Sequence, residues 1–266
     1  MENKKISSFL KFNRLTIWYF LLLITIGSIS KGEEITIASD PWCPFTCEPS
    51  LEKPGLMIEV AREIFKSKGI SVNYSVSAWN RAIIDTRENK LNAVAGALKS
   101  DAPDFIYPTE NIAQQKSCFY VLKDSKWKYE GSNSLKNLVL GAVLDYTYGD
   151  PLDTYISTNS KLNAKNKNID FVSGVGTTLI LIRKILDHRI DVMVEDESAA
   201  TYNFMNNSSL VKDQLQKVGC LRPVPLYIAF SPKNPKSKYY AEIFSNGFKK
   251  FKSTLQFKTI LKKYGI

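Results

Sequence analysis

The chain has 266 residues, of which 44% are apolar and 23% are charged. This composition is typical of a globular protein and excludes an intrinsically disordered chain. The net charge is +10 at pH 7, and the basic residues are spread out, with their densest stretch in residues 249–266. No compact basic groove with interleaved aromatic residues is visible, so we do not expect nucleic-acid binding.

Residues 1–30 have the layout of a secretory signal peptide. A basic stretch that ends at Arg14 precedes an apolar run, residues 15–29, and the small residues Ser28 and Ser30 stand at its end. The competing interpretation is an uncleaved membrane anchor, because the run approaches the length that spans a bilayer. No cysteine closes the run, and no later segment is apolar enough to span a membrane. We therefore expect export to the periplasm and a soluble mature chain.

The cysteine count fits an oxidising compartment. Four cysteines follow residue 30, and an even number in an exported chain favours disulfides, with three pairings open. We favour Cys43 with Cys47 and Cys118 with Cys220. A zinc site would require histidines or clustered thiols, and His188 is the only histidine. We therefore predict neither a metal site nor a cofactor.

The first half of the chain alternates short apolar strands with helices. Residues 35–39 form the first predicted strand, and a loop rich in proline and cysteine follows over residues 40–54. Apolar pairs then recur every four residues from Leu56, which predicts a helix with one buried face that ends near Gly69. Further elements in order are a strand at 72–76, a helix at 79–88, a strand at 91–98 and an extended segment at 118–123.

The alternation resumes after a polar stretch. We predict strands at 139–144, 169–172 and 190–194, helices at 175–187 and 197–205, and an extended segment at 224–230. Two basic amphipathic helices end the chain; their apolar stripes are expected to be core and their lysines a solvated face. Alternating strands and helices of this kind predict an α/β fold with mainly parallel sheets.

The sequence lacks the usual catalytic constellations. A single histidine provides no Ser-His-Asp or Cys-His arrangement, and the segment 174–176 (GVG) has neither a P-loop nor a dinucleotide fingerprint. Four acids cluster between Asp191 and Glu197, but side chains at a strand-to-helix junction point in different directions. At most two of these acids can line one cleft, so we do not predict an enzyme.

Several runs together resemble one known family, the family 3 extracellular solute-binding proteins. The likeness covers essentially the whole mature chain and is carried by residues 77–110, 141–150, 188–202, 226–235 and 261–266. The resemblance implies a two-lobed periplasmic-binding-protein-like fold of type II, in which each lobe is a mainly parallel sheet flanked by helices and two crossover strands join the lobes. Lobe 1 would comprise residues 31–117 and 223–266, and lobe 2 would comprise residues 118–222.

The resemblance also implies a function. Members of the family capture polar amino acids or related solutes in the interlobe cleft, close on them by hinge motion, and deliver them to the membrane permease of an ABC importer. We expect a monomer with no catalytic residue. Cys118 and Cys220 would lie near the two crossovers. The alternatives are a dehydratase-like enzyme that uses Glu195 and Asp196 as acid or base, and a sensory or partner-docking module.

The charged site residues follow the family only in part. The resemblance puts Asp196 where the receptors pair an aspartate with the α-ammonium of the ligand, and the alternative role for Asp196 is a helix N-cap. The arginine that usually holds the ligand carboxylate is absent after Gly96. Lys99 or Arg81 would have to supply positive charge instead, although neither replaces a bidentate guanidinium and exposure is the common fate of both.

Aromatic residues supply the remaining candidates. The family often sets an aromatic ring against the ligand just after the first strand, where Trp42 stands, and Trp79 begins the helix after the second strand. Loop residues Phe45, Tyr146 and Tyr148 are further candidates for the same cleft. Aromatic walls suit an apolar, ring-bearing or cationic ligand, although any of these residues could instead be core. Backbone amides near Thr147, at a predicted helix start, could bind an anionic group.

Overall fold

The computed structural model describes residues 32–50, 52–161, 168–211 and 213–266. The predicted signal peptide, residues 1–30, lies outside the described residues. Within the described ranges, no helix combines the length and the apolar character that crossing a membrane requires.

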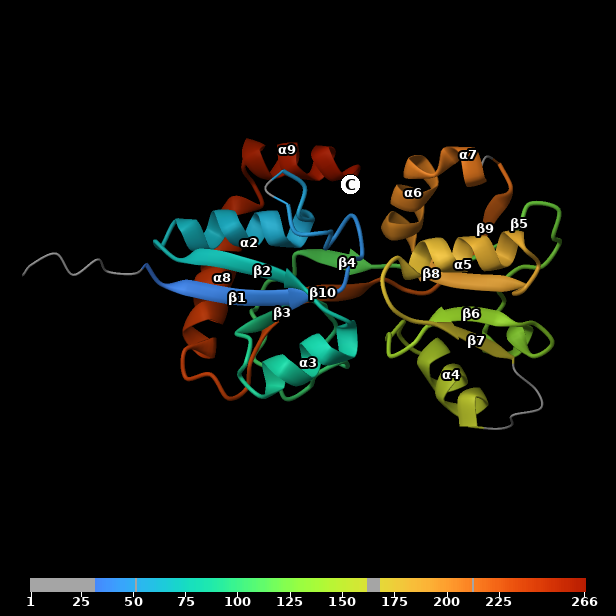
Figure 1. The fold of residues 1–266 in the computed structure, drawn as a ribbon, viewed down its shortest axis with the longest axis horizontal. Coiled ribbons are helices and arrows are strands. Elements are labelled where there is room, and N and C mark those ends of the chain that lie inside the picture. The colour runs from blue at the N-terminus through green and yellow to red at the C-terminus, as the bar shows by residue number, and fades with distance from the viewer. Residues whose placement is uncertain (1–31, 51, 162–167, 212) are drawn as a thin grey trace, which may run out of the picture. The chain divides into compact units, whose positions relative to one another are not determined.

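The framework consists of two five-stranded sheets (Figure 1). The first sheet has the order β2-β1-β3-β10-β4, and β10 runs antiparallel to both of its neighbours while the other four strands share one direction. This confirms the predicted α/β fold, and the sheet is mixed, with two parallel and two antiparallel strand pairs. Its strands are β1 (Glu34–Ser39), β2 (Ser71–Val76), β3 (Ala93–Ala97), β4 (Ala113–Gln115) and β10 (Val224–Phe230).

The second sheet repeats this pattern. Its order is β7-β6-β8-β5-β9, and here β5 is the strand that runs against the other four. Its strands are β5 (Ser117–Leu122), β6 (Leu140–Val143), β7 (Ile169–Val172), β8 (Val192–Asp196) and β9 (Leu215–Cys220).

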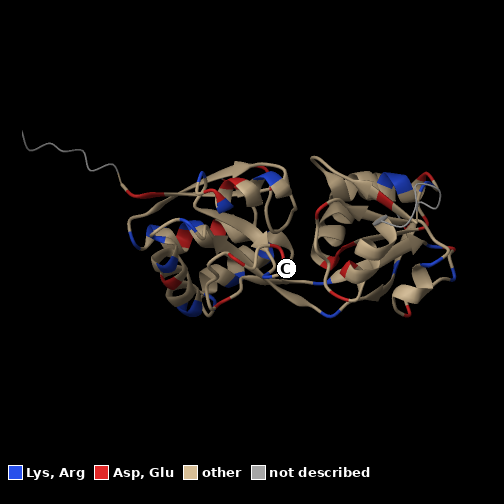
Figure 2. Ribbon diagram, turned by 90° about the horizontal axis from the view of Figure 1, so that it is seen from below, with Lys and Arg blue, Asp and Glu red and all other residues tan. Residues whose placement is uncertain are grey.

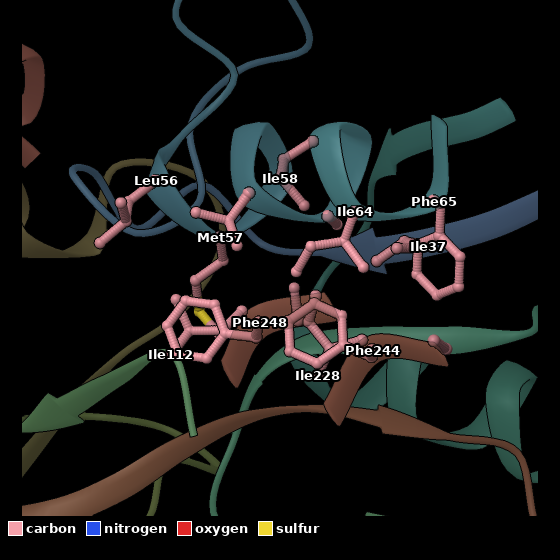
Figure 3. Close-up of a cluster of buried hydrophobic side chains, with 14 of the residues drawn as sticks. Ile37, Leu56, Met57, Ile58, Ile64, Phe65, Ile112, Ile228, Phe244 and Phe248 are labelled. Atoms are coloured by element: carbon pink, nitrogen blue, oxygen red, sulfur yellow. The ribbon is translucent and has the colours of Figure 1, made fainter. Parts of the chain in front are cut away.

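Helices cover both faces of the first sheet. On one face, α2 (Leu56–Lys66) packs with α8 (Ser237–Phe251) and α9 (Leu255–Tyr264), and α3 (Trp79–Arg87) covers the other face. Figure 3 shows Met57 and Ile64 of α2 directed toward Phe244 and Phe248 of α8. Each fully buried side chain of this size contributes about 1.5–3 kcal/mol to folding.

The two C-terminal helices follow their predicted apolar stripes except at Tyr239 and Leu255, which are 50% and 79% exposed. Ile243, Phe244 and Phe248 are buried in the first core. The lysines of α8 and α9 are exposed, and Figure 2 shows Lys and Arg scattered over the helices and loops rather than gathered in one stripe. These helices are therefore core elements with a solvated basic face.

The second sheet is also covered on both faces. Helices α5 (Thr177–Leu186) and α6 (Glu197–Asn206) pack on one face and α4 (Leu152–Lys161) on the other. Strand residues alternate between these faces: Cys118 and Tyr120 of β5 join α5 and α6, while Phe119 and Val121 join α4. The short helices η1 (Ser132–Leu135) and α7 (Ser208–Val211) complete the described elements.

Five described elements escaped the sequence prediction: the four-residue helices η1 and α7, and three others that escaped for identifiable reasons. Strand β4 has only three residues, and β9 (LQKVGC) combines a lysine with a glycine, so neither shows a clean alternation. Helix α4 (LDTYISTNSK) is mostly polar, and its apolar face is limited to Leu152, Tyr155 and Ile156. In each case contact with the sheet, by strand pairing for β4 and β9 and by packing for α4, determines the structure rather than the local sequence pattern.

The chain passes between the sheets at two places. Lys116 separates β4 from β5, and residues 221–223 separate β9 from β10; these connections lie side by side because Val224 pairs with Gln115 and Cys118 pairs with Cys220. The Cys118–Cys220 disulfide joins the second pair, and Cys43 is bonded to Cys47. Both favoured cysteine pairings are confirmed.

Candidate functional site

A small cavity lies where loops from both sheets meet. Its walls follow the carboxyl ends of β1, β2, β3 and β6, which is the edge where open α/β sheets bind ligands because their loops converge there. Two of the lining residues belong to the loop after β6, and the others come from the first sheet and its loops. The lining residues are Ser39, Asp40, Trp42, Trp79, Ala95, Gly96, Asp101, Gln115, Tyr146 and Thr147.

The loop after β1 holds Trp42 in a fixed position. Trp42 and Thr46 exchange backbone hydrogen bonds of 2.6 and 3.2 Å, and the Cys43–Cys47 disulfide closes the same turn. The ring of Trp42 packs on Phe45 at 4.7 Å between centroids. This short, cross-linked turn limits the freedom of the indole before any ligand binds, which lowers the entropic cost of binding.

Trp42 reaches across to the second sheet through Glu195. Its indole Nε1 donates to Glu195 Oε1 at 3.0 Å, and that carboxylate also accepts from Thr178 Oγ1 at 2.6 Å and from the Asp196 amide at 2.8 Å. Glu195 is 2% exposed, and burial raises the pKa of its carboxyl to about 7. Three donors around one buried acid compensate part of its desolvation.

Two more acids of the first sheet meet hydroxyl groups of the loop after β6. The Tyr146 hydroxyl donates to Asp40 Oδ2, and the Thr147 hydroxyl hydrogen-bonds the Asp101 carboxyl. Burial raises the pKa of Asp40 and of Asp101 to about 6 in each case. Each carboxyl therefore has a hydrogen-bond donor from the opposite wall, and neither has an oppositely charged partner among the described residues.

Gly96 forms a β-bulge at the cavity wall. Tyr227 of β10 pairs with Ala97 and Ile228 pairs with Ala95, so Gly96 is the extra residue of β3, and its φ of +94° is accessible mainly to glycine. A Cβ atom at this position would lie 4.0 Å from Cε3 of Trp42. The bulge thus brings bare backbone to the cavity beside the Trp42 ring.

Three of the six sequence-predicted ligand residues line the cavity, namely Trp42, Trp79 and Thr147. Arg81 and Lys99 are not among the lining residues. The Arg81 side chain is 64% exposed and pairs with Asp85 at 2.6 Å, while the Lys99 ammonium lies 5.3 Å from the centre of the Tyr227 ring.

Asp196 has backbone partners on both carboxylate oxygens. Oδ1 accepts from the amides of Ser198 and Ala199 at 2.8 and 3.0 Å, and Oδ2 accepts from the Lys116 amide at 2.7 Å. The residue is 2% exposed and does not line the cavity. This is the geometry of a helix N-cap on α6, the alternative role that the sequence left open.

The predicted helix start at Thr147 is wrong, because α4 begins at Leu152. The amides of Tyr148 and Gly149, which would face an anionic group, donate instead to the Asp153 carboxylate at 2.8 and 2.9 Å. The Asp153 carboxylate therefore already accepts hydrogen bonds from the two backbone amides of this loop. The Thr147 carbonyl accepts from the Gln115 side chain at 2.8 Å.

The aromatic loop candidates separate in the structure. Tyr146 lines the cavity, Phe45 is buried in the core of the first sheet, and the hydroxyl of buried Tyr148 accepts from the Val143 amide at 2.7 Å. Sequence reasoning missed the roles of Asp40 and Asp101. The available signal was position, since each is an acid that closely follows the end of a buried strand.

Comparisons with known proteins identify the fold. No family model and no curated protein matches the sequence. Solved structures do match: an ancestral arginine-binding protein (TM-score 0.70, 16% identity, 87% of this chain and 97% of that chain) and a histidine kinase sensor domain with similarity to periplasmic binding proteins (TM-score 0.69, 16% identity, 88% and 96%).

A third similar structure is the arginine-, lysine- and histidine-binding protein of Geobacillus stearothermophilus (TM-score 0.68, 15% identity, 87% of this chain and 95% of that chain). The chain therefore has the two-lobed fold of type II periplasmic binding proteins, as the resemblance in sequence implied.

Proposed function

We propose that the protein is a periplasmic solute-binding protein that captures a small polar solute in this cavity for an ABC-type importer, without chemical conversion of the solute. The observation that carries the proposal is the origin of the lining residues, which come from both sheets. Only two short connections join the sheets in the described part of the chain. A solute that contacts both walls can therefore bias the hinge between them.

Cross-cavity contacts indicate how capture would operate. Trp42 with Glu195 and Tyr146 with Asp40 are side-chain pairs that join the two walls. A hinge motion that separates the walls must break these pairs and expose buried acids to water. Contacts from a bound solute would add to them, so the solute stabilises the arrangement in which both walls touch it.

The similar structures support capture of a solute, since two of the three reported are named for amino acid binding. Export to the periplasm and delivery to a permease belong to the same proposal. They draw on the apolar stretch in residues 1–30, the two disulfides and the shared fold.

Ligand-dependent thermal unfolding tests the proposal. A solute that binds only the folded protein stabilises it by about 2.7 kcal/mol at a concentration of one hundred times Kd. We expect such a rise in Tm for at least one member of a panel of amino acids, amines, organic acids and short peptides. Trp79→Ala should abolish the rise and Trp127→Ala, outside the cavity, should retain it. A panel without any shift would contradict solute capture.

An enzyme on the same fold is the second candidate, and buried Glu195 favours it. A carboxyl whose pKa is raised to about 7 suits general acid or base catalysis at neutral pH, and Glu195 bonds directly to a cavity-lining ring. Product analysis after long incubation of each binding solute distinguishes the two functions. Turnover that disappears in Glu195→Gln would favour the enzyme, and unchanged solute would favour capture alone.

A sensory module is the third candidate, because the sensor domain of a histidine kinase shares the fold. This version requires an anchored amino terminus or a membrane receptor. Mass spectrometry of the exported protein tests the anchored form: a chain that starts near residue 31 excludes it, and a chain that retains the apolar stretch favours it.

A further inference from the structure

We infer that the solute is a small organic cation without a carboxylate, an amine rather than an amino acid. The inference rests on the proposed function and specifies its solute class. It follows from three features of the cavity: the sign of its charges, its aromatic walls and the missing counter-ion for its acids.

The ionisable charge in the cavity wall is entirely acidic. Among the lining residues, all of them described, Asp40 and Asp101 are the charged types, and neither lysine nor arginine is present. Glu195 accepts a hydrogen bond from the indole N–H of Trp42, and Asp153 adds a further negative charge near Asp101. The field inside the cavity therefore favours a cation and opposes an anionic group.

The basic residues that could have offset these acids are engaged elsewhere. Arg81 pairs with Asp85, Lys116 pairs with Glu197 at 2.8 Å, and Lys99 lies over the Tyr227 ring. Binding an α-carboxylate normally requires a guanidinium or a cluster of free amides. The loop amides of Tyr148 and Gly149 already donate to Asp153, so this part of the wall offers no such cluster.

The aromatic residues complete a cation site. Trp42, Trp79 and Tyr146 line the cavity, and the Trp42 and Tyr146 rings meet edge to face with centroids 6.3 Å apart. Because the Trp42 indole N–H is bonded to Glu195, the polar edge of that ring is satisfied. The ring packs on Phe45 on one side and lines the cavity, where it can attract a positive charge as aromatic walls do for ammonium ligands.

The acids in the cavity have no positive partner among the described residues. Asp40 accepts from the Tyr146 hydroxyl and Asp101 from the Thr147 hydroxyl and the Leu98 amide, all of which are neutral donors. An ammonium or guanidinium group would add a charge-assisted hydrogen bond to either acid. The cavity is small in this arrangement of its walls, which favours a small cation.

Isothermal titration with matched pairs tests the inference. The probes are L-lysine with cadaverine, L-ornithine with putrescine and L-arginine with agmatine, in which each second member lacks only the α-carboxylate. We expect the decarboxylated member of at least one pair to bind about tenfold tighter or more, because an unpaired carboxylate would face two acids. Neutral sugars and dicarboxylates complete the panel and should not bind.

The other outcomes separate this inference from the proposed function. Equal or tighter binding of the amino acids would overturn the cation inference and leave solute capture intact, as would binding of a sugar or a dicarboxylate alone. Absence of binding by every probe would overturn both.

Two variants test the residues that carry the charge. Asp101→Asn retains an oxygen for the Leu98 amide while removing the charge, and Asp40→Asn does the same beside Tyr146. We expect each to weaken amine binding by about tenfold. Asp213→Asn, on a side chain that is 85% exposed, is the matched control and should bind as the parent does. If both cavity variants bind amines unchanged, the inference fails; should Asp40→Asn not fold, Asp101→Asn decides.

Discussion

The two sheets share one topology but contribute unequally to the cavity. Each has three parallel strands, one reversed strand and an outer strand, in equivalent orders. Eight of the ten lining residues nevertheless come from the first sheet and its loops, including both acids and both tryptophans. The second sheet adds two hydroxyl-bearing residues, Tyr146 and Thr147. The shared strand order therefore determines where the cavity forms, and the loops determine which wall supplies the acidic and aromatic side chains.

The ends of the third parallel strands illustrate this difference. In the first sheet, β3 ends with the Gly96 bulge and a loop that brings Asp101 to the cavity. In the second sheet, β8 runs directly into α6, and Asp196 is the cap of that helix. A carboxylate at a strand end thus binds backbone amides when a helix follows at once, and faces the cavity when a loop follows.

The disulfides provide the strongest test of this comparison. Cys118 and Cys220 close a separation of 102 residues within the second sheet, for which chain entropy predicts a loss of about 5 kcal/mol in unfolding free energy when both become serine. Cys43 and Cys47 are four residues apart beside Trp42, and their removal should cost only about 2 kcal/mol by the same model.

Solute affinity should respond in the opposite order, with the larger loss for the Cys43/Cys47 pair because it orders the loop of Trp42. Urea unfolding and titration of both double variants measure these effects. Equal losses of affinity in the two variants would contradict the view that the Cys43–Cys47 disulfide serves solute binding while the Cys118–Cys220 disulfide serves stability.

The contact between the walls gives the next largest effect. Trp42→Phe leaves the buried Glu195 carboxylate without one of its three donors and should lower the unfolding free energy by about 2 kcal/mol. Trp127→Phe is the matched control, since its indole donates to the Ser134 carbonyl at 3.1 Å away from the cavity. We expect similar losses of stability in denaturant melts, but weaker solute binding, by about tenfold, only for Trp42→Phe. Weakened binding in both variants would show that general destabilisation is the cause.

Glu195 should make the solute-free protein less stable as the pH rises. Burial raises its pKa to about 7, so between its unfolded value near 4.5 and 7 the folded state holds the proton more tightly. The resulting stability is fully present below the unfolded pKa and is lost as the pH rises through the folded pKa. Asp40, Asp101 and Asp196, with pKa values raised to about 6, act with the same sign.

Glu195→Gln should therefore flatten the decline between pH 5 and pH 8 by about 1–2 kcal/mol, as measured by urea unfolding across that range. Glu197→Gln is the control: ion pairs with Lys116 and Lys217 lower the pKa of Glu197, so its titration lies below this window. An identical decline in the parent and in Glu195→Gln would contradict the role of Glu195.

Asp196 should give the smallest effect on binding. Asn caps helices nearly as well as Asp, but it has one oxygen where Asp196 uses two, so Asp196→Asn should cost about 1 kcal/mol in chemical unfolding. Because both oxygens already bind backbone amides, we expect solute affinity to change less than about twofold in titration. A loss of solute affinity of tenfold or more would instead support the role that the family resemblance implies for Asp196, which is pairing with the ammonium group of the ligand.

Much of the architecture could be predicted because it depends on local patterns. The four-residue recurrence of α2 and the apolar strands β1, β2 and β7 appear within a residue or two of their predicted positions. The family resemblance suggested that Trp42, just after the first strand, and Trp79, at the start of the helix after the second, face the cleft, and both line the cavity. The lobe ranges 31–117, 118–222 and 223–266 stay a proposal.

The sequence by itself determined the α/β alternation, the disulfide-forming cysteines and the absence of arginine from residues 97–104, since each depends on residue type and spacing along the chain. The tertiary structure decided which acids face the cavity. Trp42 and Glu195 are 153 residues apart in sequence, yet their hydrogen bond joins the two walls. Such contacts depend on how two sheets present their loops to each other, and that arrangement is set by packing over the whole chain rather than by any local pattern.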